Sequence, residues 1–133
     1  MSGCSIMGSY YLRNYLNEAV QLILVRSESP VPLEEKAFVF KYEDRIQKLQ
    51  FYTFKQLTKE LKAQKLDNYR VSLTVPAQST VWMGIGLNTN SWNFAQARLV
   101  YGGQERSIDL NNPSEVTFKR SGIGHYVGYY NIK

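Results

Sequence analysis

Residues 69–87, YRVSLTVPAQSTVWMGIGL, carry two runs of alternating apolar residues separated by a turn. Apolar side chains occupy every second position from 69 to 75 and again from 81 to 87. A period of two places these side chains on one face of a β-strand. Pro76 lacks an amide N–H, so it interrupts the ladder of a sheet, and Pro-Ala-Gln-Ser suits a tight turn. The stretch therefore predicts two half-buried strands, which form either a hairpin or an arch between two sheets.

The remainder of the chain favours strands as well. Ten Tyr, six Phe and two Trp accompany many β-branched residues, and aromatic and β-branched side chains are enriched in strands. Alternation bounded by turn residues predicts strands at 10–15, 19–26, 36–43, 47–53, 92–101, 104–110, 115–119 and 125–132. Short strands at this spacing favour an all-β fold, an antiparallel β-sandwich of about 7–9 strands. An OB-like barrel is the alternative.

One segment has a helical rather than a strand period. Phe54, Leu57 and Leu61 recur at the spacing of a single helical face, with lysines between them. A threonine precedes a glutamine by three positions at the start of this segment, as in a capping box. The pattern predicts one short helix at about 54–65, held by packing on the sheet.

The length of 133 residues is typical of a single domain. With one cysteine, the sequence allows no intramolecular disulfide, and no apolar run approaches the roughly 20 residues of a membrane span. We divide the chain into an N-terminal tether at 1–9 and a single β-sandwich domain at 10–133.

The N-terminal residues Ser2, Gly3, Cys4 and Ser5 form a motif that is similar to the end of a bacterial lipobox. In this class of lipoproteins a small residue pair precedes a cysteine that becomes lipidated and N-terminal after cleavage. The resemblance implies a lipid anchor on Cys4, an apolar signal segment ahead of this stretch, and a Met1 that is not native. A serine after the cysteine implies the outer membrane, where Cys4 attaches the domain to the bilayer.

The tether sets how far the domain stands from the bilayer. Five residues, 5–9, separate Cys4 from the first predicted strand, and at roughly 3.5 Å per residue they span under about 20 Å. A domain this close to the membrane is suited to an envelope protein partner. Without lipid on Cys4, the cysteine is an ordinary thiol in a frayed terminus and the alternative location is cytoplasmic.

The net charge of +5 is concentrated in residues 36–70, which hold nine Lys or Arg and four acids. A local basic excess is typical of surfaces that bind phosphates or anionic lipids. The alternative interpretation is a set of ordinary solvated helix and strand faces.

Residue types for catalysis or metal binding are few. The single histidine, His125, lies between Gly and Tyr, and a Cys4–His125 nucleophile pair would need an ordered N-terminus and a third orienting group. There is no second cysteine, no histidine pair and no Asp-rich loop. We therefore expect a non-catalytic protein with no cofactor and no metal.

Aromatic residues are the remaining candidates for a binding site: Trp82, Trp92, Tyr126 and Tyr130. An outward aromatic platform could stack on sugar rings, and a cross-strand aromatic ladder inside the sheet is the alternative. The leading hypothesis is a non-catalytic envelope lipoprotein, a structural or protein-interaction module close to the membrane. A carbohydrate-binding sandwich is second. A basic OB-like nucleic-acid-binding module is third, and lipidation of Cys4 would make nucleic acid an unlikely partner because the domain would face the periplasm.

Overall fold

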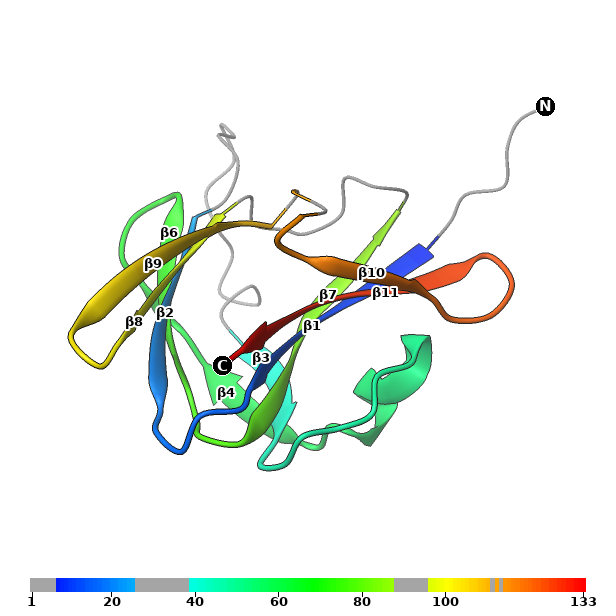
Figure 1. Cartoon of the computed structure of the whole chain (residues 1–133), viewed down its shortest axis with the longest axis horizontal. Helices are drawn as coiled ribbons and strands as arrows, with labels where there is room; N and C mark the ends of the chain where they lie inside the picture. Colours follow the sequence, from blue (N-terminus) through cyan, green and yellow to red (C-terminus); the bar gives the residue numbers. More distant parts are fainter. Residues whose placement is uncertain (1–6, 26–38, 88–95, 111, 113) are drawn as a thin grey trace.

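The fold is a sandwich of two β-sheets, seen in a computed structural model that describes residues 7–25, 39–87, 96–110, 112 and 114–133 (Figure 1). The larger sheet contains, in spatial order, β10 (Thr117–Arg120), β11 (His125–Ile132), β1 (Met7–Asn14), β7 (Ser79–Leu87), β3 (Val39–Glu43) and β4 (Lys59–Lys62). The smaller sheet contains β5 (Gln64–Lys65), β6 (Arg70–Val75), β2 (Val20–Val25), β8 (Gln96–Tyr101) and β9 (Gln104–Asp109).

The predicted all-β sandwich is confirmed, and the described strands form two separate sheets rather than a closed OB-like barrel. Two details differ from the expectation. The described residues contain eleven strands instead of 7–9, because segments at 59–65 are extended. The strands are not all antiparallel, since β1 runs parallel to β11, with Met7 opposite His125.

The 69–87 stretch forms an arch and not a hairpin. Its first half, β6, pairs with β2 in the smaller sheet, and its second half, β7, pairs with β1 in the larger sheet. The chain also changes sheets between β1 and β2, and the two crossings lie side by side. Asn14 Nδ2 donates to the carbonyl oxygens of Pro76 (3.1 Å) and Glu18 (3.0 Å), and the Gln78 amide donates to the Leu16 carbonyl (3.2 Å). These bonds join the two crossings at one end of the sandwich.

The main core fills the space between the sheets. Alternate residues of β1 and β7 face it from the larger sheet, and the apolar residues of β2, β6 and β8 face it from the smaller sheet. Full burial of one such side chain contributes about 1.5–3 kcal/mol. The side chains without measurable exposure include Leu12, Leu22, Leu24, Val71, Val81 and Leu99.

The predicted helix at 54–65 is wrong. Residues Phe51–Gln56 form a short 3-10 helix, η2, and the chain then becomes extended in β4 and β5. Leu57 and Leu61, assigned to one helical face, lie on opposite faces of the larger sheet, one in an outer cluster and the other against the main core. The chain crosses from one face of the sheet to the other between the buried Leu57 and the partly buried Leu61, so their spacing resembles a helical period although no helix joins them.

The predicted strand at 47–53 is also wrong, although its buried positions, Leu49 and Phe51, are as expected. The capping interaction starts at Gln50, three residues before the predicted position at Thr53. The backbone N–H of Gln50 donates to Thr53 Oγ1 (2.8 Å). This irregular segment covers the face of the larger sheet that is turned away from the smaller sheet (Figure 1). It thereby adds a second, smaller core to the sandwich.

Candidate anion-binding site

A buried tyrosine fixes η2 to the larger sheet. The hydroxyl of Tyr11 accepts hydrogen bonds from the Phe54 amide (2.9 Å) and from Ser9 Oγ (3.1 Å), and it donates to the Phe51 carbonyl (3.1 Å). Trp82 Nε1 donates in turn to Ser9 Oγ (3.1 Å). Burial raises the pKa of Tyr11 above its ordinary value, because the ionised phenolate would lose its hydration. Tyr11 therefore stays a neutral donor that holds η2 in place.

The turn between β10 and β11 is joined to the same segment. Ser121 Oγ accepts a hydrogen bond from the Phe51 amide (2.8 Å), and the Ser121 amide donates to the His125 carbonyl (3.0 Å). The ring of His125 packs on Phe51, with ring centroids 4.2 Å apart, and on Tyr52, at 5.7 Å. These contacts place the start of η2 and the β10–β11 turn on either side of a groove.

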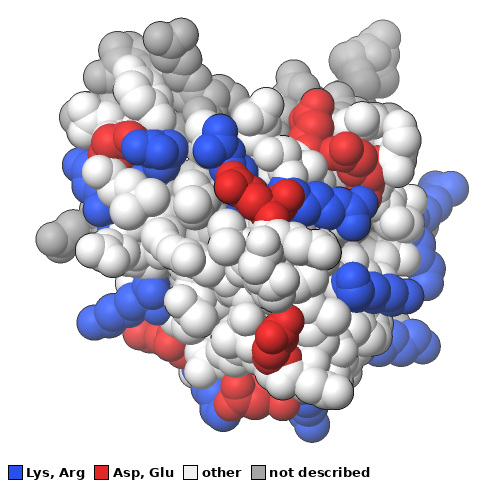
Figure 2. All heavy atoms as spheres, turned by 60° about the vertical axis from the view of Figure 1, so that its left-hand side comes forward, with Lys and Arg blue, Asp and Glu red and all other residues white. Residues whose placement is uncertain are grey.

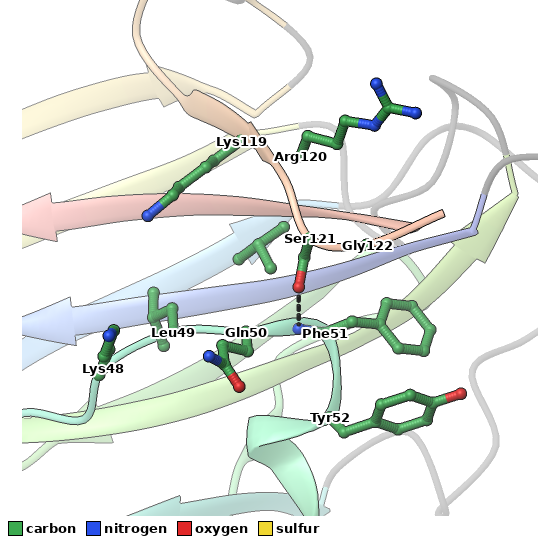
Figure 3. Close-up of a pocket in the computed structure, with 10 residues that line it drawn as sticks. Lys48, Leu49, Gln50, Phe51, Tyr52, Lys119, Arg120, Ser121 and Gly122 are labelled. Carbon is green, nitrogen blue, oxygen red and sulfur yellow. Dashed lines mark hydrogen bonds between the residues drawn. The ribbon is translucent and has the colours of Figure 1, made fainter. Parts of the chain in front are cut away.

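The groove has a volume of about 480 Å³. One wall is residues 48–52, the other is residues 119–122, and Val127 of β11 also lines it (Figure 3). Lys48 and Lys119 come from opposite walls. Lys119 is paired with the groove-lining Val127, so it shares that face of the sheet, whereas Arg120 is paired with Tyr126 and points away from the groove (Figure 3). We call this site the basic groove.

The basic groove is lined by cations and contains no carboxylate. Lys48, Lys119 and Arg120 form no ion pair with a carboxylate of the described residues. Unbalanced cations create a positive potential that favours a negatively charged group. The Ser121 hydroxyl and the exposed lysine amines supply the donors that phosphate or carboxylate oxygens require.

Acidic side chains lie among the basic ones on the face that carries the smaller sheet (Figure 2). Figure 2 brings the smaller sheet forward and shows Lys and Arg interspersed with Asp and Glu. The ion pairs of the described residues are Lys41–Glu60, Lys59–Asp44, Lys59–Glu43, Arg70–Asp67 and Arg98–Glu105. The four acids of 36–70 pair with three of its nine cations, so the net excess of this stretch remains on the other cations, and those that the structure describes lie on several elements.

The predicted aromatic site residues do not share a face. Trp82 is half-buried and stacks on Phe54, with ring centroids 4.5 Å apart, in the outer cluster. Tyr126 and Tyr130 pack on the main core, across the larger sheet from Trp82. The prediction of a common outward platform fails for these three residues because strand alternation separates them. Trp92 and Cys4 lie outside the described residues.

The two tyrosines have partners within the protein. The Tyr126 ring meets Tyr10 edge-on, and the two hydroxyl oxygens are 2.5 Å apart. Tyr130 is only 8% exposed, and burial raises its pKa above the ordinary value. These contacts correspond to the internal aromatic packing that the sequence left as the alternative.

Sequence reasoning missed the basic groove. Lys48 lies within the basic stretch, but Lys119 and Ser121 come from a part of the chain without a charge excess. The paired glycines at 122 and 124 are the one local signal, since both adopt positive φ and mark a tight turn. Residues 48–52 lie opposite 119–122 because of the path that the irregular segment takes over the sheet. The sequence of that segment has no apolar period from which this path could be predicted.

The part of the chain that the structure describes contains no cluster of three or more His, Cys, Asp or Glu side chains able to hold a metal ion. Nor do these residues include a helix that combines the length and apolarity needed to cross a membrane. Comparison of the chain with protein-family models, with curated proteins and with solved structures gave no match in any of the three.

Proposed function

We propose that the chain is a non-catalytic module of the bacterial cell envelope, anchored to the outer membrane through lipidated Cys4, that binds an anionic partner in the basic groove. The observation that carries the proposal is the charge of the groove, which has Lys48 and Lys119 on opposite walls and no carboxylate in its lining (Figure 3). The lipobox-like motif at 2–5 supplies the anchor. An envelope is rich in partners of the required chemistry, because phosphate groups are exposed on its lipids and polymers.

The register of the larger sheet supports this combination of anchor and groove. Met7, the first residue of β1, lies beside His125, whose ring packs on the groove residues Phe51 and Tyr52. Cys4 is three residues before Met7, and three residues extend at most about 11 Å. A lipid on Cys4 would therefore hold the groove end of the sandwich near the bilayer.

The surroundings of His125 support a non-catalytic role. Its ring packs against two aromatic side chains, Phe51 and Tyr52, and among the described residues no carboxylate or nucleophile forms a hydrogen bond to it. A general base needs such a partner within about 3 Å in order to be oriented or to take a proton. Binding, rather than reaction, is the chemistry that this end of the molecule favours.

The groove predicts a charge-dependent affinity for polyanions. We expect the double substitution Lys48→Gln/Lys119→Gln to weaken binding of inorganic polyphosphate about tenfold or more, because two charge-assisted contacts are lost. Isothermal titration calorimetry at constant salt gives the two dissociation constants. Both lysines are exposed, so folding should be unaffected.

The matched control is Lys62→Gln/Lys65→Gln, which removes the same charge from exposed sites on β4 and β5. This variant should bind within about twofold of the original protein, apart from the general effect of net charge. If both double variants lost affinity for polyphosphate equally, binding would depend on net charge alone and the groove would not be a binding site.

The anchor is tested separately by detergent phase partitioning of protein expressed from the full natural reading frame. The original protein should enter the detergent phase, and Cys4→Ala should stay in the aqueous phase, because partitioning follows the acyl chains. If both proteins stayed in the aqueous phase, Cys4 would not be a lipid anchor. The groove proposal would then be judged by the polyphosphate titration alone.

A further inference from the structure

The tip of the β10–β11 turn exposes an isolated large apolar side chain. Ile123 is 92% exposed, more than any other large hydrophobic residue among those described. It stands between Gly122 and Gly124, where a β-carbon would meet no atom within 4 Å. An aliphatic side chain held in water in this way gains free energy on transfer to an apolar phase.

The residues around this tip combine positive charge with amphipathic rings. The hairpin segment 117–125, TFKRSGIGH, contains Lys119 and Arg120 and no acid. Tyr52, 52% exposed, packs on His125 beside the tip. Lys55 lies over the Tyr52 ring, 4.6 Å from its centroid.

This set has the composition of a membrane-interface surface. Apolar side chains at such a surface enter the boundary between headgroups and acyl chains, while lysine and arginine meet lipid phosphates. Tyrosine has an apolar ring and a polar hydroxyl, so it is suited to the headgroup layer. The conformation of the turn is also fixed, because Ser121 forms hydrogen bonds with the backbone of both Phe51 and His125.

We propose that the β10–β11 tip docks on the anionic surface of a phospholipid bilayer. Ile123 enters the headgroup boundary, Tyr52 lies at its level, and Lys55, Lys119 and Arg120 contact lipid phosphates. This inference goes beyond the proposed function, since it does not depend on lipid at Cys4. It also makes Ile123, which does not line the groove, part of an interaction surface together with the exposed ring of Tyr52.

The test uses unlipidated Cys4→Ser protein and sedimentation with vesicles. One set of vesicles contains phosphatidylcholine alone, and the other contains equal parts of phosphatidylcholine and phosphatidylglycerol. We expect binding to the mixed vesicles only, with about a fivefold to tenfold loss for Ile123→Ser and a comparable loss for Lys119→Gln/Arg120→Gln. High salt should release the bound protein, because lipid phosphates are then screened.

Two controls separate docking from other causes. Leu66→Ser removes an exposed apolar side chain from the connection between β5 and β6, and it should leave vesicle binding unchanged. Ile123→Ser should also keep the polyphosphate affinity of the original protein, which would show that the variant is folded and that its groove is intact.

If the unlipidated protein bound polyphosphate but not mixed vesicles, membrane docking would be overturned and the groove proposal would stand. Equal vesicle binding by Ile123→Ser and the original protein, or equal binding to both vesicle types, would also overturn it.

Discussion

Replacing Tyr11 with alanine should lower the free energy of unfolding by about 3–5 kcal/mol, the range for a large aromatic side chain removed from a core. Tyr11 has no measurable exposure and lies in the outer cluster between the sheet and the irregular segment. The substitution leaves a cavity and removes all three hydrogen bonds of the hydroxyl. Such a loss is a large part of the roughly 5–15 kcal/mol that stabilises a typical domain.

Tyr11→Phe separates the hydroxyl from the ring. It keeps the buried ring but leaves the Phe54 amide and the Phe51 carbonyl without this partner, at a cost of about 1–3 kcal/mol. Urea unfolding of the three proteins, followed by circular dichroism and by Trp fluorescence, measures both effects. A Tyr11→Phe variant as stable as the original protein would show that the hydroxyl does not hold η2 on the sheet.

Gly128→Ala should destabilise the protein by about 1–3 kcal/mol through overpacking. A β-carbon at this position would lie 2.7 Å from Cδ1 of Tyr10, its neighbour across the parallel β1–β11 pair. The Tyr10 ring cannot move away from this β-carbon, because the ring is fully buried and its hydroxyl oxygen is 2.5 Å from that of Tyr126. The close approach of strand and ring therefore requires glycine for space, not for an unusual φ.

Thr117→Ala is the control for this prediction, since Thr117 is exposed on the neighbouring strand β10. Its effect should stay within about 0.5 kcal/mol. Thermal and urea unfolding of both variants give the comparison. If the two substitutions had equal effects, Tyr10 would be able to move, and the packing described for the main core would be incorrect at this point.

The period of two in the sequence was sufficient to find most of the sandwich. Val71, Leu73 and Val75 alternate with half-buried or exposed residues, and the structure buries all three in the main core. Whether this stretch was an arch or a hairpin depended on pairing with β1 and β2, which are distant in the chain. Long-range pairing of this kind leaves no trace in a local pattern.

The failed helix and the unexpected groove have one physical cause. Residues 46–57 cross the outer face of the larger sheet with the short helix η2 as their only regular structure, and their burial is set by the surface below them. Leu57 is buried there, whereas Leu61 has already passed to the other side of the sheet. The same path brings Lys48 opposite Lys119, so neither the charge of the groove nor its walls could be derived from residue spacing.

The proposed function requires that this sandwich is held at a bacterial membrane through Cys4, with the basic groove toward the lipid. Intact-mass measurement of the protein, expressed in a bacterial host from its full natural reading frame, is the decisive test. We expect a chain that begins at Cys4 and carries a diacyl or triacyl modification. An unmodified mass, with the residues before Cys4 retained, would show that Cys4 is not a lipid anchor.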